Sequence, residues 1–249
     1  MTETTPWQVQ IEQVCATVGV HEVDLLVDQA NWHINLVDAL EQLRPAVPWF
    51  SLFTGTPEEN LREQAPVLMR LDLTHWQHKA WLEELVTHCA SDARLLVVIS
   101  PVSFETLSRA LRSLLQIRWG GQRGLLRYYD PRIFPLLMSS ILTPQQRAEF
   151  RQLVFYWGWL DRDDQAQWLK GHSLGGQRAV EVAPFLELSD EQYELIGCIS
   201  DAQELLVSDQ FNQLCECAEQ RFSLLYSFVL QASRENYFGD LKAYVRGAL

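Results

Sequence analysis

The segment LLVVISPVSFETLSRALRSLL, residues 95–115, contains both hydrophobic patterns that decide the fold of this chain. Leu95–Ser100 is a short apolar run rich in β-branched residues, which predicts a buried strand. Ser103 is a favourable N-cap, and the apolar side chains after it recur at helical spacing. Glu105 and Arg109 lie four residues apart on the opposite face, where they can form an ion pair. The segment therefore predicts a strand followed directly by an amphipathic helix.

The same alternation extends over the first 160 residues. Four further short apolar runs predict strands at Val23–Asp28, Trp49–Phe53, Val67–Asp72 and Leu125–Asp130. Helices are predicted to begin after the capping box Thr56-Pro57-Glu58-Glu59 and after Thr74. Alternating strands and helices indicate an α/β fold, a mixed sheet with flanking helices in which at least part of the strand pairing is parallel.

The pattern changes after Thr143, where Pro144 and Gln146 indicate the start of another helix. Two short strands are predicted next, at Phe155–Trp159 and Ala166–Leu169. The polar run between them predicts a turn.

Helix is predicted to dominate from the capping box at Ser189 to the C-terminus. The longest helix is predicted over Asp209–Ala232, where apolar side chains recur at helical spacing. We therefore expect an α/β lobe over residues 1–188 and a small C-terminal helical lobe over residues 189–249.

The composition excludes several classes of protein. Hydrophobic residues make up 47% of the 249 residues, enough for a packed core, so dominant disorder is excluded. The net charge of −12 opposes general nucleic-acid binding. The longest aliphatic run, Leu95–Ile99, is far too short to span a membrane. Residues 1–7 lack the basic and apolar regions of a secretory signal, and five scattered cysteines form no disulfide framework. We expect a cytoplasmic protein without nucleic-acid or membrane partners.

Charge is unevenly distributed along the chain. Residues 179–220 contain ten acidic side chains and no lysine or arginine, whereas residues 105–132 contain six arginines and two acids. Seventeen of the twenty basic residues are arginines, whose planar guanidinium pairs bidentately with carboxylates. Three arrangements would produce this pattern: a charged seam between two halves of the molecule, a docking face for a partner, or two solvated surfaces that never meet.

The pattern Gly171-His172-Ser173-Leu174-Gly175 matches the Gly-x-Ser-x-Gly nucleophile elbow of serine hydrolases. In that elbow the serine lies at a strained strand-to-helix turn, and the histidine base follows it in the chain. All six histidines of this chain precede Ser173, and the residues before the pattern are polar where a buried strand is required. A serine hydrolase of lipase type is therefore the alternative hypothesis, whereas we expect a glycine-rich loop without catalytic residues.

Neither a metal nor a cofactor is indicated by the sequence. His75 and His78 share one helical face, but His88 follows too far along the same helix to converge with them. We therefore expect surface histidines. The glycine-rich phosphate-binding patterns of P-loops and of dinucleotide-binding folds do not occur in the chain.

The segment Arg127-Tyr128-Tyr129-Asp130-Pro131-Arg132 combines an aspartate, a proline and two arginines at one predicted corner. Asp130 can cap a helix that begins at Pro131, with one arginine on each side of the turn. Two interpretations fit these residues. An internal ion pair between arginine and aspartate would lock the corner, or Arg127 or Arg132 would be presented to a carboxylate of a partner.

Four motifs, including this corner, occur in an order and spacing that resemble a known family. The other three are Trp49–Pro57, the Ala65–Asp72 stretch and Val98–Pro101 with the helix that follows it. Together they are similar to a bacterial family, described as a domain of unknown function, whose members act as adaptor chaperones for effectors of the type VI secretion system. The resemblance covers about residues 23–160.

The resemblance implies a non-enzymatic adaptor. Such a protein would bind a cognate effector in the bacterial cytoplasm and help to load it onto the spike protein of the secretion apparatus. The partner-binding residues that the resemblance implies are Arg70, Asp72, Arg127, Tyr129, Asp130 and Arg132. We further expect the acidic helical lobe to dock a protein, because it offers charge for steering and an apolar stripe for contact.

Overall fold

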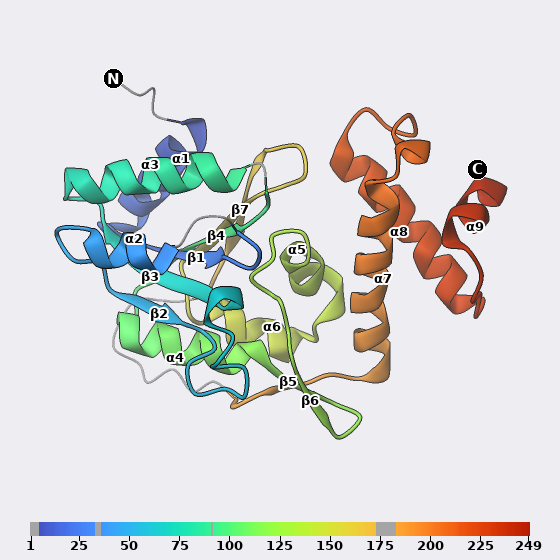
Figure 1. Ribbon diagram of the computed structural model, residues 1–249, viewed down its shortest axis with the longest axis horizontal. Coiled ribbons are helices and arrows are strands. Elements are labelled where there is room, and N and C mark those ends of the chain that lie inside the picture. Colours follow the sequence, from blue (N-terminus) through green and yellow to red (C-terminus); the bar gives the residue numbers. More distant parts are fainter. Residues whose placement is uncertain (1–4, 33–35, 91, 173–182) are drawn as a thin grey trace.

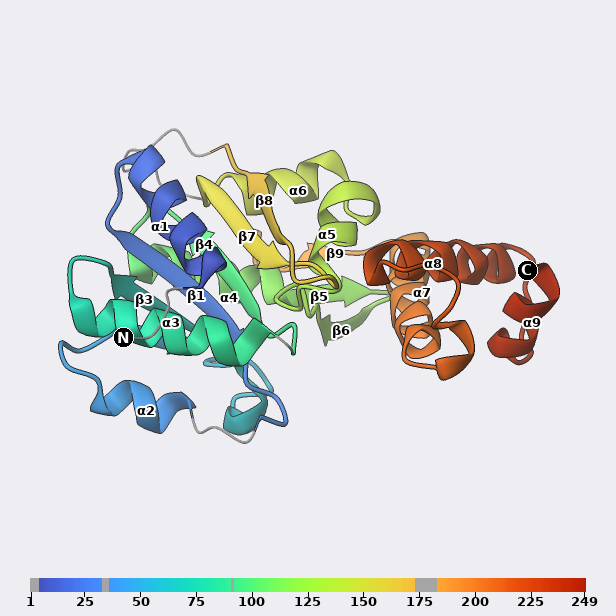
Figure 2. The same ribbon diagram turned by 90° about the horizontal axis from the view of Figure 1, so that it is seen from above.

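The computed structural model describes residues 5–32, 36–90, 92–172 and 183–249. These residues form an α/β body and a helical segment that extends from one end of it (Figures 1 and 2). The fold class predicted from the sequence, a mixed α/β fold followed by C-terminal helices, is confirmed.

Six strands of the described chain form the main sheet in the order β2-β3-β1-β4-β7-β8. Their bounds are Glu22–Asp28 for β1, Trp49–Ser51 for β2, Pro66–Asp72 for β3, Leu95–Ile99 for β4, Tyr156–Leu160 for β7 and Ala166–Lys170 for β8. Each neighbouring pair is antiparallel, so the predicted parallel pairing is wrong for this sheet. β3 and β4 do run parallel to each other, as a strand–helix–strand unit requires, but β1 lies between them and is antiparallel to both.

Helices cover both faces of the main sheet (Figure 1). One face packs against α1 (Pro6–Val18), α2 (Leu36–Gln42) and α3 (Trp76–Ala90), and the other against α4 (Phe104–Leu115) and α6 (Pro144–Arg151). Side chains alternate between the faces along each strand. In β1, Leu25 therefore packs in the cluster of α1 and α3, whereas Leu26 packs in the cluster of α4.

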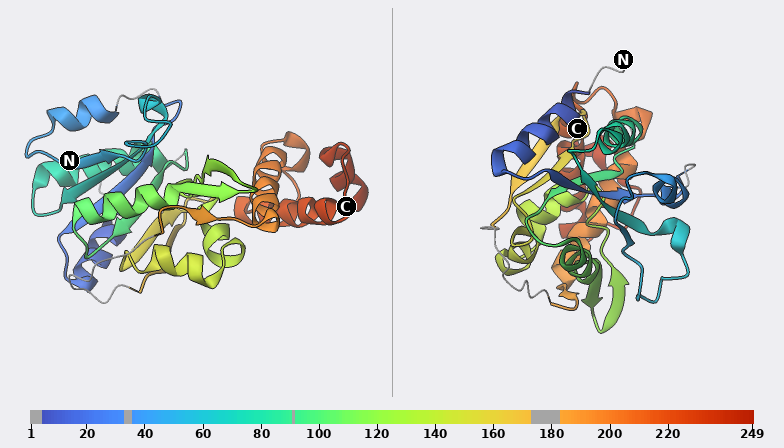
Figure 3. Two further views of the ribbon diagram at one scale, coloured as in Figure 1. Left: turned by 90° about the horizontal axis from the view of Figure 1, so that it is seen from below. Right: turned by 90° about the vertical axis from the view of Figure 1, so that its left-hand side faces the viewer.

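A second, three-stranded sheet lies between the main sheet and the C-terminal helices (Figure 3). Its strands, in the order β6-β5-β9, are β5 (Gln116–Trp119), β6 (Gln122–Leu125) and β9 (Leu186–Glu187). The remaining helical elements are α5 (Phe134–Leu136), η2 (Leu137–Ile141), α7 (Asp190–Leu206), η3 (Asp209–Phe211), α8 (Ala218–Arg234) and α9 (Leu241–Ala248). β5 and β9 pair in parallel.

One hydrophobic cluster continues from the α/β body into the C-terminal helices. It contains Phe134 and Phe150 of the body together with Ile199 of α7 and Phe222 of α8. Both parts of the chain therefore contribute to the same apolar core. The boundary between residues 188 and 189 stays a prediction.

Three predicted helix starts are confirmed by their caps. The side chain of Ser103 accepts a hydrogen bond from the backbone of Thr106 at the start of α4. Thr143 and Ser189 each form a complete capping box, at the start of α6 and α7. Local sequence signals suffice at these positions because the cap and its partner lie within one helical turn.

Three other local predictions are wrong. Thr56 caps a turn and no helix, since its hydroxyl donates to Phe53 O and accepts from Glu58 N before the chain reverses into β3. The predicted strand Leu125–Asp130 ends at Leu125, because Tyr128 turns inward and donates a hydrogen bond to Leu111 O. The predicted helix over residues 209–232 is interrupted, and α8 begins only at Ala218.

Candidate partner-binding site

Strand β1 places two acidic side chains, Asp24 and Asp28, on one face of the main sheet, because residues four apart in a strand point the same way. They are only 1% and 5% exposed. The sequence prediction missed both residues. The signal was present, since a charged residue inside the apolar run Val23–Asp28 must find a partner when it is buried.

Asp24 pairs with Arg70, which lies directly opposite on β3. Arg70 Nε is 2.7 Å from Asp24 Oδ1, and Nη2 is 2.8 Å from Oδ2. Nη1 also donates to Glu22 at 3.2 Å, and Nη2 donates to Val102 O at 3.0 Å. The guanidinium lies 5.8 Å from the ring centre of Phe104. All three nitrogens are engaged by the protein, so Arg70 is a buried cross-link between two strands.

Burial dominates the electrostatics of this pair. It raises the pKa of Asp24 to about 6, although the hydrogen bond from Arg70 acts in the opposite direction. Burial by itself would lower the pKa of Arg70, but the hydrogen bond and charge of Asp24 outweigh it, and the pKa is raised. The pair therefore depends on mutual compensation of two desolvated charges.

Asp72, two residues after Arg70 on β3, lines the same pocket of about 400 Å³ as Arg70. Its carboxylate accepts hydrogen bonds from the backbone and the hydroxyl of Thr74, which lower its pKa. Its side chain is 38% exposed, against 10% for that of Arg70. The structure thus brings Arg70 and Asp72 to one pocket, but only Asp72 has substantial contact with solvent.

The second group of predicted residues surrounds Asp28 and Asp130. Arg127 Nη2 is 2.7 Å from Asp28 Oδ2 and 3.8 Å from Asp130 Oδ2. Arg132 bonds bidentately to Asp130, with distances of 2.9 and 2.7 Å. Two carboxylates and two guanidinium groups therefore form one network, which we call the arginine corner: Asp28, Arg127, Asp130 and Arg132.

In the arginine corner the two carboxylates are buried, whereas the two guanidinium groups are partly exposed to solvent. The side chains of Asp28 and Asp130 are 7% and 4% exposed, whereas those of Arg127 and Arg132 are 49% and 37% exposed. Tyr129 is buried, and its ring centre lies 5.8 Å from the guanidinium of Arg127. Burial raises the pKa of Tyr129 to about 12, so it remains a neutral platform. The arrangement can present guanidinium groups to a carboxylate while neutralising the buried acids below them.

Asp130 also organises the backbone of the corner. Its Oδ1 accepts a hydrogen bond from Arg132 N at 2.9 Å. The predicted helix does not begin at Pro131, because residues 131–133 form a turn and α5 starts at Phe134. Asp130 therefore caps a turn instead of the predicted helix.

A further arginine, which the sequence prediction missed, connects the corner to the C-terminal helices. Arg162, in the turn between β7 and β8, donates to Arg132 O at 3.0 Å. It also pairs with Glu219 of α8 at 3.0 Å and lies 3.4 Å from the ring centre of Phe222. Its side chain is 9% exposed, and burial lowers its pKa.

The neighbouring Asp163 caps α8 from the same turn. Its carboxylate accepts hydrogen bonds from Ala218 N at 2.7 Å and Glu219 N at 3.0 Å, and these bonds contribute to its lowered pKa after the hydrogen bond from Cys217. This cap explains why the predicted long helix is divided. A helix terminus capped by a residue 55 positions away cannot be recognised from local spacing.

The basic and acidic regions of the sequence meet at a few points. Arg118 lies 3.9 Å from Glu187, and Trp119 donates to Asp190 at 2.8 Å while its ring stacks on Tyr193. In contrast, Arg109 remains 63% exposed beside Glu105. The two regions therefore touch at the second sheet through one exposed ion pair, and part of the basic surface faces solvent.

The predicted surface position is wrong for one histidine. His78 is 3% exposed, with Nδ1 accepting from Asp72 N and Nε2 contacting Pro45 O at 3.0 Å. The ring fills a core position because both nitrogens find backbone partners there. In the described part of the chain, no group of three or more histidine, cysteine, aspartate or glutamate side chains is arranged to hold a metal ion. The five cysteines are free.

The serine of the Gly-x-Ser-x-Gly pattern, Ser173, lies outside the described residues. Gly171 is described, and a Cβ atom there would clash with Val154 O and lie 2.7 Å from Arg151 O. Packing alone therefore requires glycine at this position. Among the helices of the described ranges, none is both long enough and apolar enough for a bilayer crossing.

Fold and site together define a mixed α/β protein with an arginine corner at its junction with C-terminal helices. The family model of a domain of unknown function, DUF4123, matches residues 25–149, about half of the chain, and the chain belongs to this family. The matched range contains Arg70 and Asp72 and the whole arginine corner. Comparison with curated proteins and with solved structures gave no match.

Proposed function

We propose that this protein is a cytoplasmic adaptor chaperone that binds a cognate effector of a type VI secretion system and helps to load it onto the secretion spike protein. The proposal goes beyond the family membership. It is supported by the four motifs that resemble those of adaptor chaperones, because they lie within the matched range. The observation that carries it is the arginine corner, in which Arg127 and Arg132 remain 49% and 37% exposed above buried carboxylates. Exposed guanidinium groups held in fixed positions are suited to docking a protein carboxylate.

The proposal includes the absence of catalysis. Ester hydrolysis should not exceed background in the purified protein, because no histidine follows Ser173 in the chain. Ester hydrolysis that disappears with Ser173→Ala would instead support a serine hydrolase of lipase type.

Co-purification tests the proposal directly. The tagged full-length chain is isolated from its native cells, and bound proteins are identified by mass spectrometry. We expect an effector and the spike protein among the captured proteins. Arg127→Ala and Arg132→Ala should each reduce capture, whereas Arg109→Ala, an exposed arginine of α4, should not. Capture of neither protein by the wild-type chain contradicts the adaptor function.

A further inference from the structure

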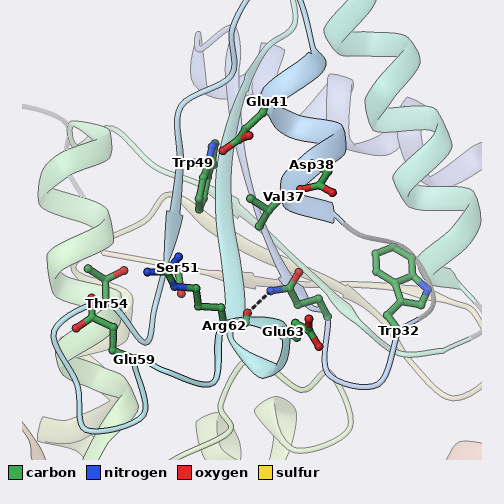
Figure 4. Close-up of a pocket in the computed structure, with 11 residues that line it drawn as sticks. Trp32, Val37, Asp38, Glu41, Trp49, Ser51, Thr54, Glu59, Arg62 and Glu63 are labelled. Atoms are coloured by element: carbon green, nitrogen blue, oxygen red, sulfur yellow. Dashed lines mark hydrogen bonds between the residues drawn. The ribbon is translucent and has the colours of Figure 1, made fainter.

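The structure contains a pocket of about 520 Å³. Its walls come from the end of β1, from α2, from the edge strand β2 and from the segment that contains η1 (Arg62–Gln64) (Figure 4). Arg70, Asp72 and the arginine corner do not line it. A pocket of this volume is large enough to enclose a side chain of a partner.

The charge of the pocket is strongly negative. Among the described residues, four exposed carboxylates line it, those of Asp38, Glu41, Glu59 and Glu63, together with one base, Arg62. In a concave site, like charges reinforce one another and raise the local concentration of an oppositely charged group. The pocket therefore favours a cation.

Two half-buried tryptophans add flat aromatic surface. Figure 4 shows Trp49 and Glu41 on one side of the pocket, Trp32 on the other, and Val37 between them. The guanidinium of Arg94 already lies 5.9 Å from the ring centre of Trp32. Indole faces attract cations, and a planar guanidinium can stack on them while its edge bonds to carboxylates.

Elsewhere in this protein, an aromatic ring and a carboxylate bind an arginine side chain at two places. Arg162 stacks on Phe222 while it pairs with Glu219. Arg118 lies 3.5 Å from the ring centre of Phe185 and 3.9 Å from Glu187. In both places an aromatic ring and a carboxylate together hold an arginine.

We propose that this pocket binds an arginine side chain of a partner polypeptide, with the guanidinium stacked on Trp49 and bonded to the carboxylate of Glu41 beside it, while Glu59 and Glu63 add to the negative charge of the pocket. Arginine fits better than lysine because its planar group can stack and bond at the same time. The inference rests on the proposed adaptor function only in taking the partner to be a protein.

The probe is the peptide acetyl-Gly-Ser-Arg-Ser-Gly-amide, titrated into the full-length protein and followed by peptide-observed NMR at low salt. The same peptide with citrulline in place of arginine has nearly the same shape without the charge. We expect saturable binding of the arginine peptide and affinity lower by about tenfold for the citrulline peptide, which corresponds to about 1.4 kcal/mol. This comparison requires no variant of the protein.

Matched variants locate the binding. Glu41→Gln/Glu59→Gln/Glu63→Gln removes three charges at the pocket, and Glu191→Gln/Glu204→Gln/Glu216→Gln removes three exposed charges on the C-terminal segment. The first triple variant should bind the arginine peptide about tenfold more weakly, and the second should change affinity less than about twofold. Equal losses in both variants would show diffuse attraction, and equal binding of the two peptides would show binding that does not depend on charge. Either result would overturn the proposal.

Co-purification separates this inference from the proposed function. If the pocket triple variant captures the same effector as the wild-type chain and the arginine peptide does not bind, the pocket inference fails and the adaptor function stands. If the wild-type chain captures no effector, the adaptor function fails, whereas the peptide titration still decides the pocket.

Discussion

Two ion pairs on the same strand use the same residue types in different surroundings. Asp24 and Asp28 both lie on one face of β1, and each is bonded to an arginine at 2.7 Å. The side chain of Arg70 is 10% exposed, whereas that of Arg127 is 49% exposed. Arg70 is enclosed by Asp24, Glu22 and Val102 O, so its bonding capacity is used within the protein. The comparison teaches that an ion pair alone does not determine whether an arginine is enclosed by the protein, as Arg70 is, or keeps contact with solvent, as Arg127 does.

The largest effect is expected at Arg70. Arg70→Ala leaves the carboxylate of Asp24 buried without its partner, which typically costs about 3–5 kcal/mol. Urea denaturation of the variant measures this loss in the free energy of unfolding. The double variant Asp24→Leu/Arg70→Met should lose clearly less, because no isolated charge remains. A loss below about 1 kcal/mol for Arg70→Ala would contradict the structural role of the pair.

The second effect concerns the connection to the C-terminal helices. Arg162→Ala removes hydrogen bonds to Glu219, Gln203 and Arg132 O, and bonds of this charged kind contribute about 1.5–3 kcal/mol. The variant should increase the hydrogen-exchange rates of backbone amides more in α7 and α8 than in β1 and β4. Equal acceleration in all four elements would show that Arg162 stabilises the whole protein and does not specifically hold the helices.

A smaller effect is expected at Asp130. Asp130→Ala removes the acceptor for the backbone and the guanidinium of Arg132 and an ion-pair neighbour of Arg127, and loss of a capping aspartate costs about 0.5–2 kcal/mol. Arg132→Ala should cost less, because its side chain is 37% exposed and water can replace it. Thermal denaturation of both variants tests the order. Equal and large losses would mean that the corner is purely structural.

The smallest change in stability is expected at Arg127. Because the guanidinium is half-exposed, water that replaces it in Arg127→Ala can hydrate Asp28, and the cost should be about 1 kcal/mol or less. Urea denaturation beside Arg70→Ala gives the comparison. A loss as large as that of Arg70→Ala would show that the difference in exposure does not matter.

Sequence signals recovered the parts of the fold that depend on near neighbours. Val23–Asp28 and Leu95–Ser100 were correctly predicted as strands, and Ser103 and Ser189 as helix caps. The antiparallel order was not predictable, because hydrophobic periodicity does not reveal that β1 lies between β3 and β4.

The candidate site shows the same division between near and distant contacts. Asp130 and Arg132 are two residues apart, and their interaction was one of the two interpretations that the sequence allowed. Asp28 meets Arg127 across 99 positions of the chain, and Arg162 meets Glu219 across 57. Only the folded chain brings these residues together, so spacing along the sequence could not identify them.

The central claim is that the arginine corner docks a partner, and the affinity of the captured effector for the Arg127→Ala variant tests it most directly. The matched control is Arg109→Ala, which removes another exposed arginine. If the corner docks a partner, Arg127→Ala should weaken binding by about tenfold or more, about 1.4 kcal/mol, with a loss of stability of about 1 kcal/mol or less. Arg109→Ala should change neither quantity appreciably. Unchanged affinity together with a large loss of stability in Arg127→Ala would contradict the account and show that the corner is an internal lock.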